Sequence, residues 1–433
     1  MADPAVLPVV SSENLTPAGP VTQKERIQSI DVMRGVALLG ILVMNIQDFS
    51  MIGQAYMNPT AYGDLHGLNY AVWYVCTLFA DLKFMSIFSM LFGAGIYLMT
   101  SRIEASGRRP GPIHYRRMGW LALFGCLHGY LLWTGDILFT YALGGMVAYL
   151  VRKWRPRKLI ISGLLFTAVS SVLFVGSYTS MPYWPKKNVD QMRETMWMPS
   201  QAQRDKDLAV HRAGWLGEEK ARAIENVGNQ IQGNIFLAFW RAYGLMLVGI
   251  GLFKLGVFSA AVPARVYRWF IALGLLVGIP VIAFGVHMEF LHHWDLRQVF
   301  FIDFQYNYWA SLLVCLFWIG LVMLICQMGW LPGARRRLGA VGRMAFTNYL
   351  THTIVCTFLF YGWGLGLYGK VSRTGQFGIV LAIWAAQLII SPWWLDRFQF
   401  GPFEWIWRSL TYRKLQPMRK RAVVPANPAT AEA

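Results

Sequence analysis

Residues 126–145, CLHGYLLWTGDILFTYALGG, place a histidine and an aspartate within a mostly apolar segment. His128 lies late in a predicted membrane span, and Asp136 lies in the short predicted turn that follows it. A carboxylate beside an imidazole orients the ring and stabilises its charge, which is the usual arrangement of a general base. We therefore interpret both residues as candidate catalytic groups. Two alternatives stay open: a histidine that bonds a neighbouring helix, and an aspartate that caps the next helix.

A second polar pattern opens the first apolar segment, DVMRGVALLGILVMN, residues 31–45. At about 100° per residue, Asp31, Arg34 and Asn45 share one stripe over roughly 20 Å of helix. Ionisable groups at membrane depth usually face the bundle interior or a water-filled cavity. We expect this stripe to line a polar tunnel, with the Arg34 guanidinium suited to gripping phosphate. Alternatively, Asp31 and Arg34 anchor the helix at the interface.

The segment FADLKFMSIFSMLFGAGIYL, residues 79–98, contains Asp81 and Lys83 within an apolar run. Residues two apart cannot share a helix face, so at least one of them needs a partner elsewhere. The span of 70–99 is also long, which predicts a broken or tilted helix. Gly93 and Gly95 are expected to allow close helix packing.

A third polar stripe runs through LGAVGRMAFTNYLTHTI, residues 338–354. Asn348 and His352 are four apart and share one helix face, and Arg343 marks the helix end. These side chains are expected to line the tunnel, or to stabilise an oxyanion. Hydrogen bonds between helices are the alternative.

Composition indicates the kind of element that holds these residues. Of 433 residues, 55% are hydrophobic and only 14% are charged, against about 25% charged in soluble domains. The net charge of +18 comes from basic clusters between apolar runs, which is typical of a membrane protein. This distribution argues against a nucleic-acid partner. The five cysteines all fall in apolar runs without CxxC spacing, so we expect neither a metal site nor a permanently bound cofactor.

The predicted fold is an all-α polytopic integral membrane protein of about ten transmembrane helices. Basic residues cluster in every alternate connection, whereas the loops at 52–67, 135–136 and 287–307 contain only Arg297. By the positive-inside pattern, we expect both termini on the cytoplasmic side of the membrane. The predicted spans are 32–51, 70–99, 118–134, 137–151, 159–178, 234–253, 267–286, 308–327, 344–362 and 377–395.

The spans divide the chain into two membrane blocks. Residues 26–178 form the first block of five spans and 234–396 the second, with an extracytoplasmic loop at 179–233 between them. A disordered tail is expected at 1–25. Residues 397–433 are expected to form an interfacial amphipathic helix with Trp anchors, followed by a disordered tail.

Five motifs in order resemble the YeiB-like family of bacterial inner-membrane proteins, a domain of unknown function. They are SIDVMRGVALLGILVMNI, KFMSIFSMLFGAGIYL, HGYLLWTGDIL, RRLGAVGRMAFTNYLTHT and GPFEWIWRSLTYRKLQP. The resemblance extends over residues 26–418, nearly the whole chain.

A more distant similarity links the SID-x-x-RG-x-AL opening and ADLKF…FGAGIYL to heparan-alpha-glucosaminide N-acetyltransferase and related membrane acyltransferases. Those proteins move an acyl group from cytosolic acyl-CoA to a sugar on the other side of the membrane. They have a functional histidine in the loop before the ADL-like motif. His66 occupies the comparable place here, which makes it a further candidate catalytic residue.

These observations favour a membrane-bound O- or N-acyltransferase with acyl-CoA as co-substrate and an unknown acceptor, a sugar hydroxyl or amine of the envelope or a secreted molecule. Arg34, Lys83 or other arginines would hold the CoA phosphates, and His128 or His66 would deprotonate the acceptor. A small-molecule transporter or exporter without covalent chemistry explains the polar stripes equally well. A structural or signalling membrane protein is the third alternative. The sequence does not determine the oligomeric state.

Overall fold

The computed structural model describes residues 27–214, 233 and 237–420. The predicted tail at 1–25 and the last residues from 421 lie outside the described residues. The helices are α1 Gln28–Ser50, α2 Gln54–Met57, α3 Gly67–Phe79, α4 Lys83–Ala105, α5 Pro110–Leu131, α6 Leu138–Val151, α7 Pro156–Ser180, α8 Lys186–Met192, α9 Gln201–Arg212, α11 Phe239–Lys254, α12 Ala264–Leu273, α13 Ile279–Leu291, α14 Leu296–Gln298, α15 Phe304–Gln327, α16 Pro332–Arg343, α17 Ala345–Phe360, α18 Arg373–Arg397 and α19 Pro402–Tyr412. Short π-helical or 3-10 turns join several of them: η2 Met181–Tyr183, η3 Arg193–Trp197, η5 Gly274–Gly278 and η6 Val299–Asp303.

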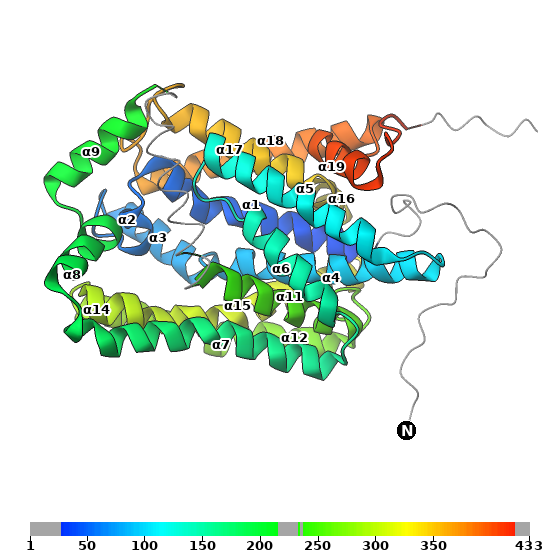
Figure 1. Cartoon of the computed structure of the whole chain (residues 1–433), viewed down its shortest axis with the longest axis horizontal. Helices are drawn as coiled ribbons and strands as arrows, with labels where there is room; N and C mark the ends of the chain where they lie inside the picture. The colour runs from blue at the N-terminus through cyan, green and yellow to red at the C-terminus, as the bar shows by residue number, and fades with distance from the viewer. Residues whose placement is uncertain (1–26, 215–232, 234–236, 421–433) are drawn as a thin grey trace, which may run out of the picture.

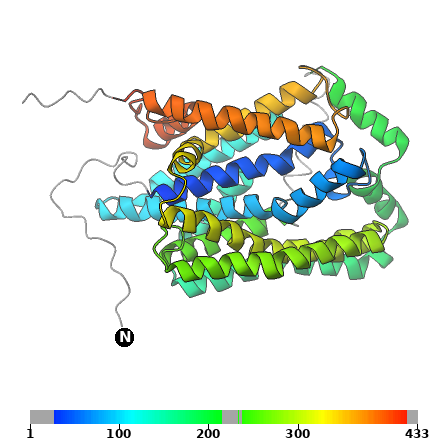
Figure 2. The same cartoon turned by 180° about the vertical axis from the view of Figure 1, so that it is seen from behind.

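The long helices run side by side in three layers (Figures 1 and 2). Helices α1 and α4 form the middle layer. One outer layer contains α5, α17 and α18, and the other contains α7 and α12 to α15. Helix α11 packs against both α4 and α7, so it joins the middle layer to the second outer layer. Helix α1 packs against α4, α16, α17 and α18, and most of its residues are buried.

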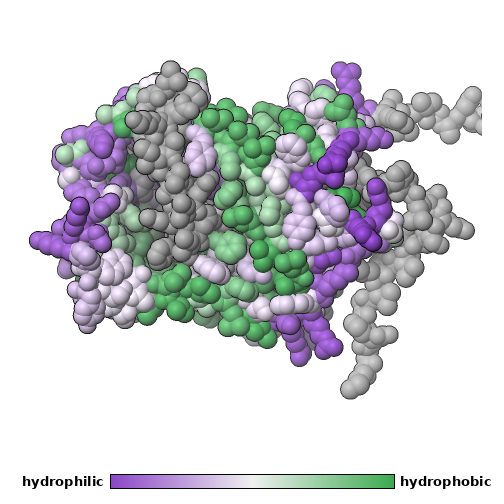
Figure 3. Space-filling model, in the orientation of Figure 1, coloured by the Kyte–Doolittle hydropathy of each residue, from purple (hydrophilic) through white to green (hydrophobic). Residues whose placement is uncertain are grey.

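Within the described residues, six helical segments are long and apolar enough to cross a membrane. They are Gln28–Ser50, Gly67–Ala105, Pro156–Tyr183, Ala264–Leu291, Leu296–Gln327 and Arg373–Arg397. On the visible face of the bundle, a hydrophobic band lies between two hydrophilic ends (Figure 3). The chain is therefore an all-helical, polytopic membrane protein, as predicted.

The other predicted spans coincide with α5, α6, α11 and α17. Helices α6, α11 and α17 have only 14, 16 and 16 residues, fewer than the roughly 20 that cross a bilayer core. Protein surrounds α11, whose residues 241–251 are all buried, whereas α6 and α17 each have exposed apolar side chains. The count of ten spans stays a prediction.

The predicted break in the second span is confirmed. Helix α3 ends at Phe79 and α4 begins at Lys83, with Leu82 between them in the left-handed region at φ 62°. Such a backbone conformation is uncommon for a residue with a side chain. The break places Asp81 and Lys83 at the junction, where both can reach partners on α15.

Glycines allow two close helix crossings. A side chain at Gly35 of α1 would collide with Leu338 of α16, and one at Gly93 of α4 would collide with Met246 of α11. The packing role predicted for Gly93 is therefore confirmed. The same prediction was wrong for Gly95, because a side chain there would meet no atom within 4 Å.

The two ends of the bundle differ in character. We call the end that carries Arg102, Arg117, Arg152 and Arg343 the basic end. Helices α2, α8, α9 and α14 cover the opposite end, which we call the loop end (Figure 1). The described part of the long connection after α7 is mostly helical, and it is attached to the loop end by Asn58, whose amide donates to Trp197 O at 3.2 Å.

Candidate functional site

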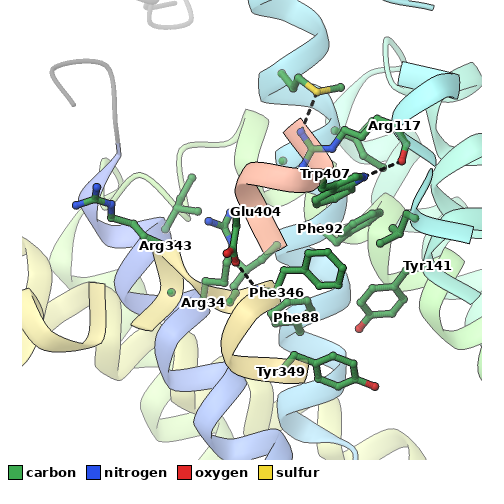
Figure 4. A pocket seen from close by; sticks show the side chains of 18 of the residues that line it. Arg34, Phe88, Phe92, Arg117, Tyr141, Arg343, Phe346, Tyr349, Glu404 and Trp407 are labelled. Atoms are coloured by element: carbon green, nitrogen blue, oxygen red, sulfur yellow. Dashed lines mark hydrogen bonds between the residues drawn. The ribbon is translucent and has the colours of Figure 1, made fainter. Parts of the chain in front are cut away.

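A cavity of about 250 Å³ opens at the basic end of the bundle. Its wall combines guanidinium groups with aromatic rings, and two carboxylates accompany them (Figure 4). The arginines are Arg34, Arg102, Arg117, Arg343 and Arg408; the acids are Asp31 and Glu404; the rings include Phe88, Phe92, Tyr141, Phe346, Tyr349, Trp407 and Tyr412. Cationic groups therefore outnumber anionic ones, which favours an anionic ligand with an apolar part.

Helix α4 gives the cavity its length and its polarity. Phe88, Leu91, Phe92, Gly95, Met99 and Arg102 all line it, so one face of α4 contributes over four turns. The rise over the 14 steps from Phe88 to Arg102 corresponds to about 21 Å of helix. The cavity is thus a narrow channel with guanidinium groups at the basic end and apolar and aromatic side chains along its length. Gly95 widens it in the middle, because the site where its side chain would stand is open.

The stripe predicted on α1 contributes its first half to this wall. Asp31 and Arg34 line the cavity, followed on the same stripe by Leu38 and Ile41. The Arg34 guanidinium donates to Asp31 Oδ1 at 2.9 Å, and the two side chains are 27% and 12% exposed. Asn45, one turn further, lies beyond the cavity wall. The structure therefore brings Asp31, Arg34 and Arg343 together at one site, as the tunnel prediction requires, but not Asn45.

Helix α19 returns to the bundle and supplies a buried carboxylate. Glu404 Oε1 accepts from the backbone amides of Phe346 at 2.7 Å and Thr347 at 3.1 Å, and Glu404 Oε2 accepts from Thr347 Oγ1 at 2.5 Å. Burial raises the pKa of this carboxyl, whereas the three donors lower it. Glu404 thus satisfies the first amides of α17, where the helix dipole favours a negative charge. On the same helix, the Trp407 ring faces the Arg117 guanidinium, whose central carbon lies 4.2 Å from the ring centre.

The histidine and aspartate singled out in the sequence are in contact. His128 Nδ1 lies 2.9 Å from Asp136 Oδ1, and both side chains are 1% exposed. Asp136 Oδ2 accepts from the Phe139 amide at 2.9 Å, so Asp136 also caps α6. On the far side of the imidazole, His128 Nε2 lies 2.9 Å from Thr353 Oγ1. Acid, imidazole and hydroxyl therefore stand in a row, with each neighbouring pair in hydrogen-bond contact.

This row adjoins the inner end of the cavity. Tyr349 lines the cavity, and its ring centre is 5.3 Å from that of His128. Ile137, the residue after Asp136, lines the cavity too. Tyr141, also at that end, exchanges a hydrogen bond with Ser89 at 2.9 Å. The Tyr349 ring therefore borders both the cavity and the imidazole of His128.

Asp81 and Lys83 form a separate cluster at the helix break. Lys83 is fully buried, and its ammonium donates to Asn307 Oδ1 at 2.7 Å and to Thr77 O at 2.6 Å. Asn307 in turn donates to Asp81 Oδ2 at 2.6 Å. Neither charged residue lines the arginine-rimmed cavity, so Lys83 is not placed to hold a phosphate there.

Asn348 and His352 pack α17 against α18 instead of lining the cavity. The Asn348 amide donates to Ser391 Oγ at 3.1 Å and to Val341 O at 3.2 Å. His352 Nε2 lies 2.9 Å from Gln387 Oε1. These contacts agree with the alternative interpretation of the stripe, in which its polar side chains form hydrogen bonds between helices.

His66 lies at the loop end, far from the arginines in the fold. Its ring contacts Asp64 Oδ1 at 2.8 Å, and its side chain is 94% exposed. Hydrogen bonds from Asn69 and His66 lower the pKa of the Asp64 carboxyl. The structure therefore favours His128 over His66 as the residue that adjoins the cavity.

Comparison with known proteins agrees with the family resemblance seen in the motifs. Over 430 aligned residues the chain is 32% identical to the uncharacterized protein YxaH of Bacillus subtilis, covering 94% of this chain and 99% of the relative. It is 31% identical to the uncharacterized protein YeiB of Escherichia coli, covering 91% of this chain and 98% of the relative. Residues 252–414 match the family described as "Protein of unknown function (DUF418)". The chain belongs to the DUF418 family.

In this DUF418 protein, the matched region supplies Arg343, Tyr349, Thr353, Glu404 and Arg408. The other side of the site comes from α1, α4 and α5, which lie before the matched region. The alignments with YxaH and YeiB cover 94% and 91% of this chain, so they include parts of both halves of the cavity.

Several site residues of this DUF418 protein were missed in the sequence. Arg102, Arg117 and Arg408 sit in basic clusters that resemble ordinary interface anchors. Thr353 and Glu404 gave weak signals, a lone hydroxyl in an apolar helix and a lone acid in a basic segment. Arg241 was also missed: it is fully buried and donates to Ser311 Oγ at 2.7 Å and Tyr308 O at 2.9 Å, away from the cavity. An arginine within an apolar run was the available signal.

Proposed function

We propose that this protein is a membrane-bound acyltransferase that takes an acyl group from acyl-CoA and passes it to a hydroxyl or amine. The observation that carries the proposal is the polarity of the channel. Arginines rim one end, apolar and aromatic side chains follow for about 21 Å along α4, and the His128–Asp136 pair adjoins the far end. An acyl-CoA has the same order of parts: phosphates, a narrow chain and a reactive thioester.

The volume of the cavity supports a binding mode in which only part of acyl-CoA enters it. About 250 Å³ lies below the 300–1,000 Å³ of typical ligand pockets. It suits an extended chain and not a whole nucleotide, so the adenosine would remain outside at the basic end. Guanidinium groups bind phosphate through paired donors, and each charged hydrogen bond contributes about 1.5–3 kcal/mol.

His128 would act as the general base at the inner end of the channel. With Asp136 accepting from Nδ1, a neutral imidazole has its Nε2 lone pair available to take a proton. Such proton transfer typically accelerates a reaction by 10²–10⁴. The acceptor would reach this site from the loop end.

The proposal includes the topology read from the sequence: ten spans in a bacterial cytoplasmic membrane, with the basic end and both termini in the cytoplasm. Basic residues gathered at one end of the bundle support it. Acyl-CoA is made in the cytoplasm, so a cytoplasmic basic end would place the arginines where the donor arrives.

The test is calorimetry on the purified protein in lipid nanodiscs with octanoyl-CoA, free CoA and octanoate. Octanoyl-CoA and free CoA should both bind at least tenfold more tightly than octanoate, because both carry the phosphates for the arginines and the pantetheine arm for the channel. A didecanoyl phosphatidate probe distinguishes a lipid phosphate site from a CoA site. Absence of octanoyl-CoA binding would remove the donor and leave the transporter alternative.

A further inference from the structure

The hydroxyl of Thr353 has an unusual partner for a threonine in a membrane helix. Six helical threonines elsewhere in the described bundle donate back to the carbonyl four residues earlier, as is common in apolar helices, whereas Thr347 donates to Glu404 and Thr374 to Asn69. The six are Thr77, Thr100, Thr167, Thr351, Thr357 and Thr411. Thr353 instead reaches across from α17 to α5 and contacts His128 Nε2 at 2.9 Å.

The direction of that hydrogen bond follows from the carboxylate on the other side of the ring. Asp136 can only accept, so the imidazole proton lies on Nδ1, and the neutral ring has a bare Nε2. The Thr353 hydroxyl therefore donates to Nε2. A hydroxyl that donates to an imidazole, which in turn donates to a carboxylate, is the arrangement that activates a nucleophile.

Thr353 also lies on the helix face that leads out of the cavity. Phe346 and Tyr349 line the cavity from α17, and Thr353 follows Tyr349 by one turn, about 6 Å along the axis. The residue is fully buried, as is expected for a site that must keep water from an acyl ester. A shift of the Tyr349 ring would connect the channel to the hydroxyl.

We infer that Thr353 is a nucleophile that carries the acyl group as an ester between donor and acceptor. This inference rests on the proposed function. Thr353 Oγ attacks the thioester carbonyl, the C–S bond breaks, and the hydroxyl proton passes through His128 Nε2 to the departing sulfur, which leaves as a thiol. The acceptor hydroxyl or amine then attacks the Thr353 ester, and its proton returns through Nε2 to Thr353 Oγ. No oxidant or reductant is needed.

The experiment uses the full-length protein in nanodiscs with octanoyl-CoA and no added acceptor. After an acid quench, mass spectrometry should find one octanoyl group on the peptide that contains Thr353. Thr353→Ser should retain the adduct, Thr353→Val should lose more than 99% of it, and His128→Gln should slow its formation by 10²–10⁴. Thr357→Val is the matched control, since it removes a hydroxyl one turn away that bonds only within α17. It should label like wild type.

Calorimetry with octanoyl-CoA on the same samples separates two kinds of failure. If wild type binds octanoyl-CoA but no adduct forms, or if Thr353→Val labels as fast as wild type, the nucleophile is wrong and the donor site stands. If wild type does not bind octanoyl-CoA, the proposed function fails and this inference fails with it. Thermal unfolding of each variant shows whether loss of the adduct reflects loss of folding. Because Thr353→Ser keeps the hydroxyl, an adduct that persists in this variant and is lost in Thr353→Val assigns the ester to residue 353.

Discussion

Gly95→Leu should close the channel in the middle without disturbing the fold. Gly95 lines the cavity on α4, and a side chain there would begin in open space. Leucine adds four carbon atoms. If each occupies about the 30 Å³ of a water molecule, together they fill roughly 120 Å³ of the cavity of about 250 Å³.

The expected loss of affinity follows from the chain that leucine displaces. Four methylene groups excluded from the apolar part of the channel, at about 0.8 kcal/mol each, correspond to about 3 kcal/mol. That is roughly a two-hundredfold weaker binding of octanoyl-CoA. Free CoA should lose about as much, because its pantetheine arm would occupy the same part of the channel, whereas octanoate alone should bind as weakly as it does to wild type. Helix stability should not fall, because glycine is the less favourable residue within a helix by roughly 0.8–1 kcal/mol.

The assay is calorimetric titration of octanoyl-CoA into wild type, Gly95→Leu and a matched control. Gly119 of α5 is that control: a side chain there also meets open space, but Gly119 is on an exposed face outside the cavity. Gly119→Leu should bind octanoyl-CoA like wild type. If Gly95→Leu binds octanoyl-CoA with unchanged affinity while it unfolds at the wild-type temperature, the pantetheine arm does not pass through this cavity.

Three further predictions concern the rim, a helix cap and the topology. Arg34→Lys should weaken octanoyl-CoA binding about ten- to a hundredfold in calorimetry, because one charged hydrogen bond is worth roughly 1.5–3 kcal/mol and lysine lacks the paired donors; unchanged affinity would take Arg34 out of the phosphate site. Glu404→Gln should lower the free energy of unfolding by about 1–2 kcal/mol, since the charge that caps α17 is lost; an unchanged unfolding curve in denaturant titration would contradict this role. Reporter fusions at Gln201 and Pro417 should report opposite compartments, and the same compartment for both would end the ten-span topology.

Much of the fold was predictable because apolar runs and turn residues act locally. The interruption at Asp81 and Lys83 predicted the break between α3 and α4, and the structure confirms it. Prolines and serines mark several helix starts, for example Pro156 at the start of α7 and Ser372, whose hydroxyl accepts from the Gly375 amide. Helix length was harder to predict, since α11 and α17 have 16 residues each, fewer than the apolar runs around them suggest.

The site was only partly predictable because helical periodicity gives faces but not partners. Spacing put Asp31 and Arg34 on one stripe, and both do line the cavity. The same rule put Asn348 and His352 on one face, yet that face packs against α18. Glu404 reaches Thr347 only because α19 folds back, a contact between residues 57 apart in the chain. No local sequence pattern predicts such a contact.

The His128–Asp136 contact is an intermediate case. His128 and Asp136 are only eight residues apart, and a tight connection joins the two helices. Contact between their side chains could therefore be expected. Thr353, 225 residues away from His128, could not be inferred in the same way. Its hydroxyl becomes informative only when its hydrogen bond is compared with those of the neighbouring threonines.

The most direct test of the donor site is a cryo-EM structure of the wild-type protein in lipid nanodiscs with a thioether analogue of octanoyl-CoA. The account predicts density for the phosphates among Arg34, Arg102 and Arg343, and a chain that passes Gly95 towards Tyr349 and His128. Analogue density in any other place, or a cavity that holds only lipid at saturating analogue, would contradict it.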